Sequence, residues 1–243
     1  MGKYIAEIAG KDSVAAVMKF MSENREAIIV PTIVYTGTEY GDRDSYYNSV
    51  DFLKEKGKEK GIQFSETIEL QDGKLWNLLC AKYQYLINKK YGFYTPCIAC
   101  HLFTHLLRLP LLRSLNADGI ITGERHSHQG KLKANQHPLT ISCFDDIFEE
   151  NQVKIIRPLV HINDTDLVNR QIGDENIIAH ANDIKCVLSG NLQGFELEDN
   201  LDMLKRYLEE FLAPVGGFCA GELLKGNENL MDELESKIKE VLL

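Results

Sequence analysis

Two cysteines separated by two residues, Cys97 and Cys100, carry the clearest chemical signal in the sequence. Thiolates at this spacing can share a metal ion or an iron–sulfur cluster, and the expected start of a helix at this point would lower a thiol pKa. The same pair could instead form a redox disulfide, carry a persulfide or have a purely structural role. A closed zinc site needs four ligands, and the sequence has no second C-x-x-C.

A third cysteine, Cys186, follows an expected helix over 175–182 and lies on a polar loop. Three cysteines with one open position suit a [4Fe–4S] cluster whose fourth iron can bind an external ligand. Cys219 is flanked by glycines in an expected loop, and it is a candidate fourth ligand or a separate nucleophile. Cys80 and Cys143 have apolar neighbours and are expected to be inert core thiols.

A second candidate site lies near the start of the chain, where an apolar strand over 4–8 precedes a short turn and a helix. The turn residues are Ala9, Gly10, Lys11, Asp12 and Ser13. A helix N-terminus presents unpaired amides, Gly10 allows close approach of a ligand, and Lys11 adds positive charge, so the stretch predicts a phosphate-binding turn. The alternative is an ordinary turn in which Asp12 or Ser13 is only the N-cap. The spacing is not that of a Walker A loop.

The rest of the chain alternates apolar strands with helices, which predicts a Rossmann-like open parallel sheet with helices on both faces. Strands are expected over 4–8, 27–35, 63–70, 118–122 and 154–160, and helices over 12–24, 44–60, 73–90, 101–115 and 164–173. We expect a nucleotide-binding α/β domain over 1–173. A smaller, mostly helical appendage over 174–243 is expected to contribute a cysteine to the site, with helices over 197–212 and 227–243 and a Gly/Pro-punctuated loop over 213–222.

Polar loops follow the expected strands at the edge where open α/β sheets bind ligands. Thr36 and Gly37 follow the second strand, and Arg157 ends the fifth, where it could bind phosphate or pair with an acidic neighbour. The loop after the fourth strand is interpreted as a phosphate and substrate lid, although a solvated surface loop would look similar. It contains Gly123, Glu124, Arg125, His126, His128, Lys131 and Lys133. His126 and His128 are weaker candidates for metal ligands, and His101 is expected to be a neighbour of the cysteine pair.

The net charge and the distribution of apolar residues bear on which partners and which compartment we expect. The 243 residues carry a net charge of −9, which gives no overall attraction to nucleic acid or to an anionic membrane. No apolar run is long enough to span a bilayer, and charged residues interrupt the N-terminus, so we expect a cytoplasmic protein with no membrane partner. In that compartment the cysteines are expected to be buried, catalytic or metal-binding. The last helix alternates acidic and basic residues, which is typical of a solvated face and leaves a homodimer open.

Taken together, these segments resemble the PP-loop ATP pyrophosphatases, which have the adenine nucleotide alpha-hydrolase-like fold. The stretch from Ala9 to Ser13 matches the G-x-D-S half of their S-G-G-x-D-S pattern, while the leading Ser and the first Gly are replaced. Thr36-Gly37 and the T-G-x-R of Thr122 to Arg125 resemble the phosphoadenosine-phosphosulfate reductase branch. Ile156 to Leu159, followed by the helix over 164–173, resembles the ATP-dependent sulfurtransferases that thiolate tRNA. In cluster-containing members a C-x-x-C and a later cysteine bind a [4Fe–4S] cluster.

The resemblance implies an ATP-dependent sulfurtransferase that adenylates a carbonyl oxygen of its substrate and replaces that oxygen with sulfur, releasing AMP and pyrophosphate. ATP and Mg²⁺ would be bound by the residues from Ala9 to Ser13, with Thr36, Gly37, Gly123 and Arg157. Lys11, Asp12, Arg125 and Cys186 would be catalytic, and Cys97, Cys100 and Cys186 would hold the cluster. The implied partners are a sulfide or persulfide donor and a small-molecule or tRNA substrate. The alternatives are a sulfonucleotide reductase-like enzyme and a non-catalytic nucleotide-binding module.

Overall fold

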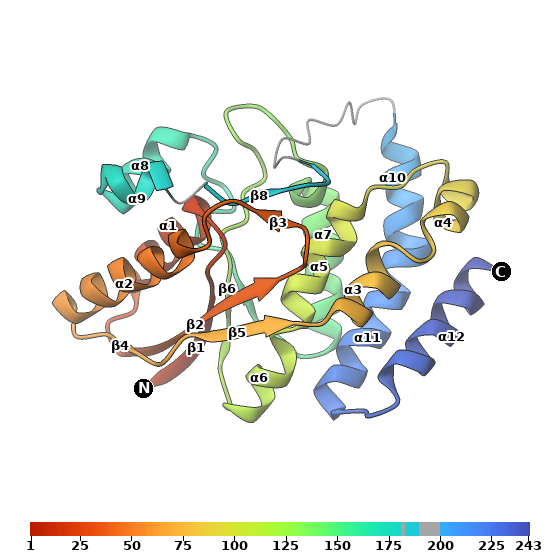
Figure 1. The fold of residues 1–243 in the computed structure, drawn as a ribbon, viewed down its shortest axis with the longest axis horizontal. Coiled ribbons are helices and arrows are strands. Elements are labelled where there is room, and N and C mark those ends of the chain that lie inside the picture. Colours follow the sequence, from red (N-terminus) through yellow and green to blue (C-terminus); the bar gives the residue numbers. More distant parts are fainter. Residues whose placement is uncertain (181–182, 190–199) are drawn as a thin grey trace.

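A computed structural model describes residues 1–180, 183–189 and 200–243, and it confirms the α/β fold with a parallel sheet between two layers of helices (Figure 1). The strands of this sheet run in the order β4-β2-β1-β6-β7, and β5 also pairs with β2. Every pairing within it is parallel. The strands are β1 (Gly2–Glu7), β2 (Ala27–Tyr35), β4 (Gln63–Phe64), β5 (Ile68–Gln71), β6 (Gly119–Ile121) and β7 (Ile155–Ile156).

Alternate residues of the central strands face two separate apolar cores, as the period of two along a strand requires. Ile5 and Val30 point to one side, whereas Ala6 and Ile29 point to the other. The core around Ala6 and Ile29 is covered by α1 (Lys11–Glu23), α2 (Asp44–Glu59) and α8 (Thr165–Ile172). The opposite core is covered by α3 (Gly73–Cys80), α4 (Gln84–Tyr91), α5 (Pro96–Leu106), α6 (Leu109–Ser114) and α7 (Pro138–Glu150), together with the C-terminal helices.

The register of the sheet brings two chain-distant loops to one edge. Ala6 of β1 pairs with Ile121 of β6, so the turn that follows β1 emerges beside the loop that begins at Thr122. On the other side of β1, Glu7 pairs with Thr32 of β2. A two-stranded antiparallel sheet of β3 (Glu39–Tyr40) and β8 (Lys185–Cys186) lies beyond this edge and carries Cys186 to it.

Several expected elements are divided in the structure. The expected strand over 63–70 is split into β4 and β5, and the expected helix over 73–90 is split into α3 and α4. The helix expected to reach residue 115 ends at Leu106 and is followed by α6. Pro110 explains this break, because its ring would clash with the carbonyl of Leu106 in a continuous helix. Helix α7 was missing from the sequence prediction.

The expected loop over 213–222 is wrong, because these residues belong to a helix. The C-terminal segment contains α10 (Leu201–Tyr207), a π-helical turn (Leu208–Leu212), α11 (Ala213–Lys225) and α12 (Leu230–Leu242). Pro214 is the second residue after the π-helical turn in an unbroken run of helix, where its missing amide removes one helical hydrogen bond. A Cβ on Gly216 would lie 2.7 Å from Leu102 of α5 and 2.9 Å from Ile147 of α7, so this glycine permits close helix packing.

Cys219 lies in α11 with no exposed surface, inside the apolar core that also contains Ile5 and Val30. Burial raises the pKa of its thiol. This placement contradicts the expectation that Cys219 is a ligand or a nucleophile. The division into segments 1–173 and 174–243 stays a prediction, although the C-terminal helices and the sheet share this core.

Two further observations complete the fold. The expected helix over 175–182 is present as α9 (Glu175–His180), and residues 181–182 lie outside the described ranges. Over those ranges, the structure contains no helix with the length and apolar character needed to cross a membrane.

Candidate functional site

The turn between β1 and α1 is closed by the Ser13 hydroxyl. Its Oγ accepts hydrogen bonds from the amides of Ala9 (2.9 Å) and Gly10 (3.1 Å) and donates to the Gly10 carbonyl (2.7 Å). The N-cap of α1 is Gly10, so the alternative in which Asp12 or Ser13 is the N-cap is wrong. The first bond of the helix runs from the Val14 amide to Gly10, which leaves the amides of residues 11–13 at the positive end of the helix.

These residues line a cavity of about 300 Å³, here called the strand-edge cavity. Besides the five turn residues, its walls include Glu7, Cys97, His101, Thr104, Gly123, Glu124 and Lys133. The turn and Gly123 were predicted from sequence to belong to one nucleotide site. In the structure they line the same cavity. Lys11 and Lys133 supply positive charge to this cavity, while Glu7, Asp12 and Glu124 supply carboxylates.

Gly123 packs directly against the backbone of the turn. A Cβ at this position would lie 2.4 Å from the Ser13 nitrogen and 2.6 Å from the Asp12 carbonyl carbon. Backbone atoms held by the Ser13 bonds cannot move aside as a flexible side chain would. Gly123 is therefore needed for the contact between the two loops.

Gly123→Ala is expected to reduce the free energy of unfolding by about 1–3 kcal/mol, the usual cost of overpacking. Urea unfolding followed by circular dichroism measures it. Gly73→Ala is the matched control, since a Cβ on Gly73, in the first turn of α3, would meet no atom within 4 Å. Equal stability of the two variants would contradict the proposed backbone contact.

Asp12 pairs with Arg125 of the loop after β6, and His128 of the same loop accepts a hydrogen bond from that guanidinium. Arg125 Nη2 lies 3.3 Å from Asp12 Oδ1, and His128 Nδ1 lies 3.6 Å from Asp12 Oδ2. Arg125 is buried and also donates to the Ile162 carbonyl, and its side chain lines neither cavity described here. The geometry therefore makes Arg125 a positioning residue for Asp12.

Glu124 is the centre of a buried polar cluster beneath the strand-edge cavity. Its carboxylate accepts from Thr122 Oγ1 (2.6 Å) and Arg157 Nε (2.5 Å), and it contacts His101 Nε2 (3.0 Å) and His105 Nε2 (2.8 Å). Burial opposes ionisation, but His105, Arg157 and the hydrogen bonds from the two histidines outweigh it and hold the pKa of Glu124 well below its usual range. Burial lowers the pKa of His105.

Arg157 pairs with acidic neighbours, which was one of the two alternatives for this residue. Its guanidinium contacts both Glu124 and Asp145 and lines neither the strand-edge cavity nor the one described next. Arg157 therefore lies outside both cavities and holds the Glu124 carboxylate in place through an ion pair.

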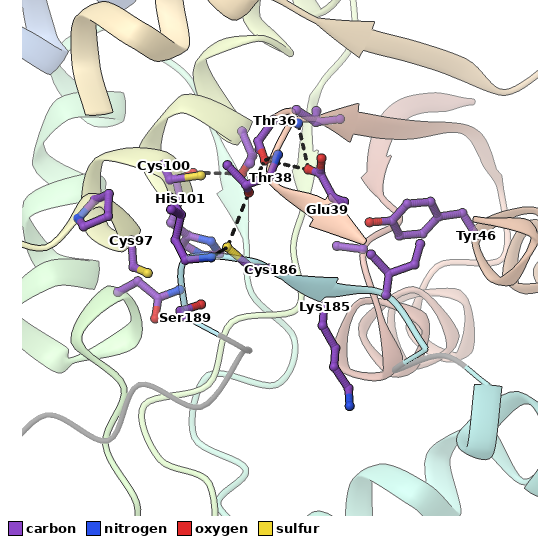
Figure 2. Close-up of a pocket in the computed structure, with 17 residues that line it drawn as sticks. Thr36, Thr38, Glu39, Tyr46, Cys97, Cys100, His101, Lys185, Cys186 and Ser189 are labelled. Atoms are coloured by element: carbon purple, nitrogen blue, oxygen red, sulfur yellow. Dashed lines mark hydrogen bonds between the residues drawn. The ribbon is translucent and has the colours of Figure 1, made fainter. Parts of the chain in front are cut away.

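Cys97, Cys100 and Cys186 line a second cavity of about 210 Å³, the cysteine cavity (Figure 2). Cys97 and Cys100 come from the first turns of α5, whose N-cap Thr95 accepts a hydrogen bond from the Cys97 amide. Cys186 comes from β8, and its Sγ lies 3.4 Å from Thr38 Oγ1. Thr36 and Glu39 also line this cavity. Cysteines that are 86 residues or more apart in sequence therefore meet at one opening.

Thr36 and Gly37, expected from sequence to bind the nucleotide, are not among the residues that line the strand-edge cavity: Thr36 lines the cysteine cavity, and Gly37 lines neither. The Glu39 carboxylate accepts from the amides of Thr36 (2.7 Å) and Gly37 (2.9 Å) and from the Thr36 hydroxyl (2.6 Å). Gly37 has a positive φ of 81°, which suits glycine in this tight turn. The residues after β2 thus shape the loop that carries β3, and through β3 they position β8.

The thiols of the C-x-x-C pair have different acidities. A hydrogen bond from Cys80, opposed by burial and assisted by Trp76, lowers the pKa of Cys100 to about 7. The Trp76 contribution is a bond from Nε1 to Sγ of 3.2 Å. Burial raises the pKa of Cys97.

Alkylation of metal-free, reduced protein by iodoacetamide should therefore separate the two thiols by pH. Cys100 should be mostly thiol at pH 6 and mostly thiolate at pH 8, so its rate should rise with a midpoint near pH 7, while Cys97 should react at higher pH. Peptide mass spectrometry measures both rates. Trp76→Phe should move the Cys100 midpoint upward. Superimposable profiles for the two peptides would refute this assignment.

The two cavities adjoin. Ala9, Cys97, His101 and Thr104 belong to the walls of both. A molecule bound at the turn after β1 therefore borders on the space enclosed by the three cysteines.

Some residues of the site were not found from sequence. His105 was missed, although a His101-x-x-x-His105 spacing places both rings on one face of a helix. His126 and His128 were considered as metal ligands, but His126 packs on His161 with ring centroids 5.4 Å apart, and His128 contacts Arg125 and Gln136. Over the described ranges, His101, His105 and Glu124 form the group of three whose potential ligand atoms all lie within 4.8 Å of one another.

Comparison with known proteins gives one informative match. No family model matches the chain. The chain is 31% identical over 239 residues to uncharacterized protein MJ0009 of Methanocaldococcus jannaschii, and the alignment covers 96% of this chain and 85% of that protein. Identity at this level along nearly the whole chain shows common descent and a shared fold. The chain therefore belongs to the protein family of uncharacterized protein MJ0009.

Proposed function

We propose that this protein is an ATP-dependent sulfurtransferase of the PP-loop type. The observation that carries the proposal is the shared wall between the strand-edge cavity and the cysteine cavity. This wall is formed by Ala9, Cys97, His101, Thr104, Asn135 and Ser189. A substrate activated at the first cavity would lie next to the second, from which it could receive sulfur.

The strand-edge cavity has the features of a site for a metal-bound polyphosphate. It combines the N-terminus of α1 with Lys11 and Lys133, which favour phosphate oxygens. The Asp12 carboxylate would repel a bare polyphosphate, but it is a suitable oxygen ligand for Mg²⁺. We therefore assign Asp12 to the metal and Lys11, with the amides of residues 11–13, to the phosphates.

The cysteine cavity suits a [4Fe–4S] cluster in its donor set. Cys97, Cys100 and Cys186 are all partly exposed at one opening, whereas Cys80, Cys143 and Cys219 are buried. Soft thiolate ligands select iron–sulfur clusters over hard cations. When bound, a cluster with three protein ligands would offer a coordination position for the sulfur to be transferred.

The proposed reaction has two steps. A carbonyl oxygen of the substrate attacks the α-phosphorus of ATP, an O–P bond forms, and pyrophosphate leaves with the electrons of the broken bond. Hydrosulfide then attacks the activated carbon, the C–O bond breaks as AMP leaves, and the hydrosulfide proton passes to solvent or to the substrate nitrogen. Lys11 and Lys133 would stabilise the negative charge that develops on the phosphates.

The experiment is an anaerobic assay of reconstituted protein with ATP, Mg²⁺ and sulfide, using bulk tRNA in one arm and small amides in the other. Formation of AMP and pyrophosphate together with a thiolated product is expected. Asp12→Asn should abolish AMP formation while leaving iron content unchanged, and Asp146→Asn on α7, outside both cavities, is the control. Tight ATP binding with no pyrophosphate from either substrate class would favour a non-catalytic module. Sulfite release from an adenylyl sulfate without ATP would favour the reductase alternative.

A further inference from the structure

His101, His105 and Glu124 form a compact group that neither the proposed ATP site nor the proposed cluster uses as ligands. We propose that His101 Nε2, His105 Nε2 and Glu124 Oε1 bind a divalent transition-metal ion of the Zn²⁺ or Fe²⁺ class, with an open coordination position toward the strand-edge cavity. The sulfurtransferase assignment is independent of this site.

The three donor atoms lie close enough together to converge on one ion. Glu124 Oε1 lies 3.0 Å from His101 Nε2 and 2.8 Å from His105 Nε2, and all three atoms lie within 4.8 Å of one another. Metal–ligand bonds of about 2.0–2.2 Å in a tetrahedron put neighbouring ligand atoms roughly 3.3 Å apart. The two distances from Glu124 Oε1 lie within about half an ångström of this spacing. The distance between the two histidine nitrogens is at most 4.8 Å, so rotation of the imidazole rings would bring the three donors around an ion. Two imidazoles and one carboxylate are also a common ligand set of zinc and non-haem iron.

Neighbouring side chains orient all three proposed ligands. The second oxygen of Glu124 is fixed by Thr122 Oγ1 and Arg157 Nε, so Oε1 is the oxygen left toward the histidines. Outer contacts of this kind orient the ligands of metal sites. His101 and His105 are one helical turn apart on α5, and their rings contact Phe144 of α7, which limits their rotation.

The environment of His105 also favours a metal ligand at this position. His105 is fully buried, and its Nδ1 has no hydrogen-bond partner in the described structure. Its only polar contact is thus through Nε2, the proposed ligand atom.

Access to the site comes from one side. His101 and Glu124 line the strand-edge cavity, whereas His105 is covered by Phe144 and Phe148. An ion held by the three residues would therefore direct its remaining position at the cavity that we assign to ATP, where water or an anionic group of a substrate could bind. This open position is typical of catalytic rather than structural zinc sites.

Cobalt(II) absorption tests the site without any activity assay. The full-length, metal-free chain with Cys97, Cys100 and Cys186 replaced by alanine is titrated with Co²⁺, so that no thiolate of the cysteine cavity competes. We expect one equivalent to bind with a visible d–d band and without the near-ultraviolet thiolate band. His105→Gln and Glu124→Gln should each weaken binding by at least about tenfold, since even outer contacts of metal sites are worth that much. His126→Gln, outside the group, should leave binding unchanged.

The wild-type chain is titrated in parallel, with circular dichroism to confirm folding. There His105→Gln should remove the d–d band of nitrogen and oxygen ligands and leave the thiolate band. If the folded chain lacking the three cysteines binds no Co²⁺, or if binding is equal in the His105→Gln, Glu124→Gln and His126→Gln variants, the site is refuted. Should the triple variant not fold, the loss or retention of this band in wild type decides the question.

Discussion

Cys186→Ala is expected to reduce the iron content of anaerobically reconstituted protein from about four atoms per chain to well below one. Cys186 is the one ligand that reaches the cysteine cavity from β8, whereas Cys97 and Cys100 both come from α5. Two thiolates on one helix turn cannot hold three corners of a cluster, so the loss of Cys186 should release the cluster. The brown colour and visible absorption should disappear with the iron.

The ATP affinity of the Cys186→Ala variant shows whether the substitution affects the cluster alone. Cys186 lines the cysteine cavity and is not part of the strand-edge cavity, so the variant should bind ATP with unchanged affinity. Cys143→Ala is the matched control, because Cys143 is a core thiol of α7. Retention of four iron atoms by Cys186→Ala would eliminate Cys186 as a ligand. Loss of iron in Cys143→Ala as well would indicate a general effect of cysteine removal.

The fold and much of the site follow from local sequence patterns. The apolar run over 27–35 predicts a buried strand, and β2 matches it. The turn from Ala9 to Ser13, Gly123 and the pair Cys97 and Cys100 were chosen from sequence because each follows a strand or begins a helix, whereas Cys186 was chosen as a third cysteine on a polar loop. Parallel strands deliver such residues to one edge whatever the details of packing, which is why local reasoning brought them together.

The parts that were missed depend on contacts between distant residues. Glycines in α11 look like loop residues in sequence. Gly216 is instead a helix residue that leaves room for Leu102 and Ile147, and residues so distant in sequence do not contribute to a local pattern. Arg125 and Arg157 look like phosphate ligands because they are cationic and follow strands. Their carboxylate partners, Asp12 for one and Glu124 and Asp145 for the other, become visible only in three dimensions. His105 differs, because its spacing from His101 is a local signal, and only its third partner, Glu124, required the structure.

Arg108 illustrates this dependence most strongly. It lies just after α5 and is 1% exposed, although arginine is rarely buried without a partner. Its Nε donates to Thr32 Oγ1 (2.8 Å), and Nη1 donates to the Thr104 carbonyl (2.5 Å) and lies 3.8 Å from Glu7 Oε1. Glu7 is also buried and accepts from the Gly123 amide (3.4 Å). Arg108 therefore compensates the charge of a carboxylate that supports the loop after β6.

Arg108→Met should lower the free energy of unfolding by about 3–5 kcal/mol, because it leaves the Glu7 carboxylate buried without its cation. Methionine fills a similar volume, so the loss should come mainly from the unpaired charge. Urea unfolding with an unchanged m-value measures it.

The double variant Glu7→Gln with Arg108→Met separates charge from packing. If the unpaired carboxylate causes the loss, removing its charge should restore a large part of the stability, and the double variant should be more stable than Arg108→Met alone. A double variant that is less stable than Arg108→Met by the full cost of Glu7→Gln would show that the two residues act independently. In that case the hydrogen bonds to Thr32 and Thr104, rather than the pairing with Glu7, would account for the burial of Arg108.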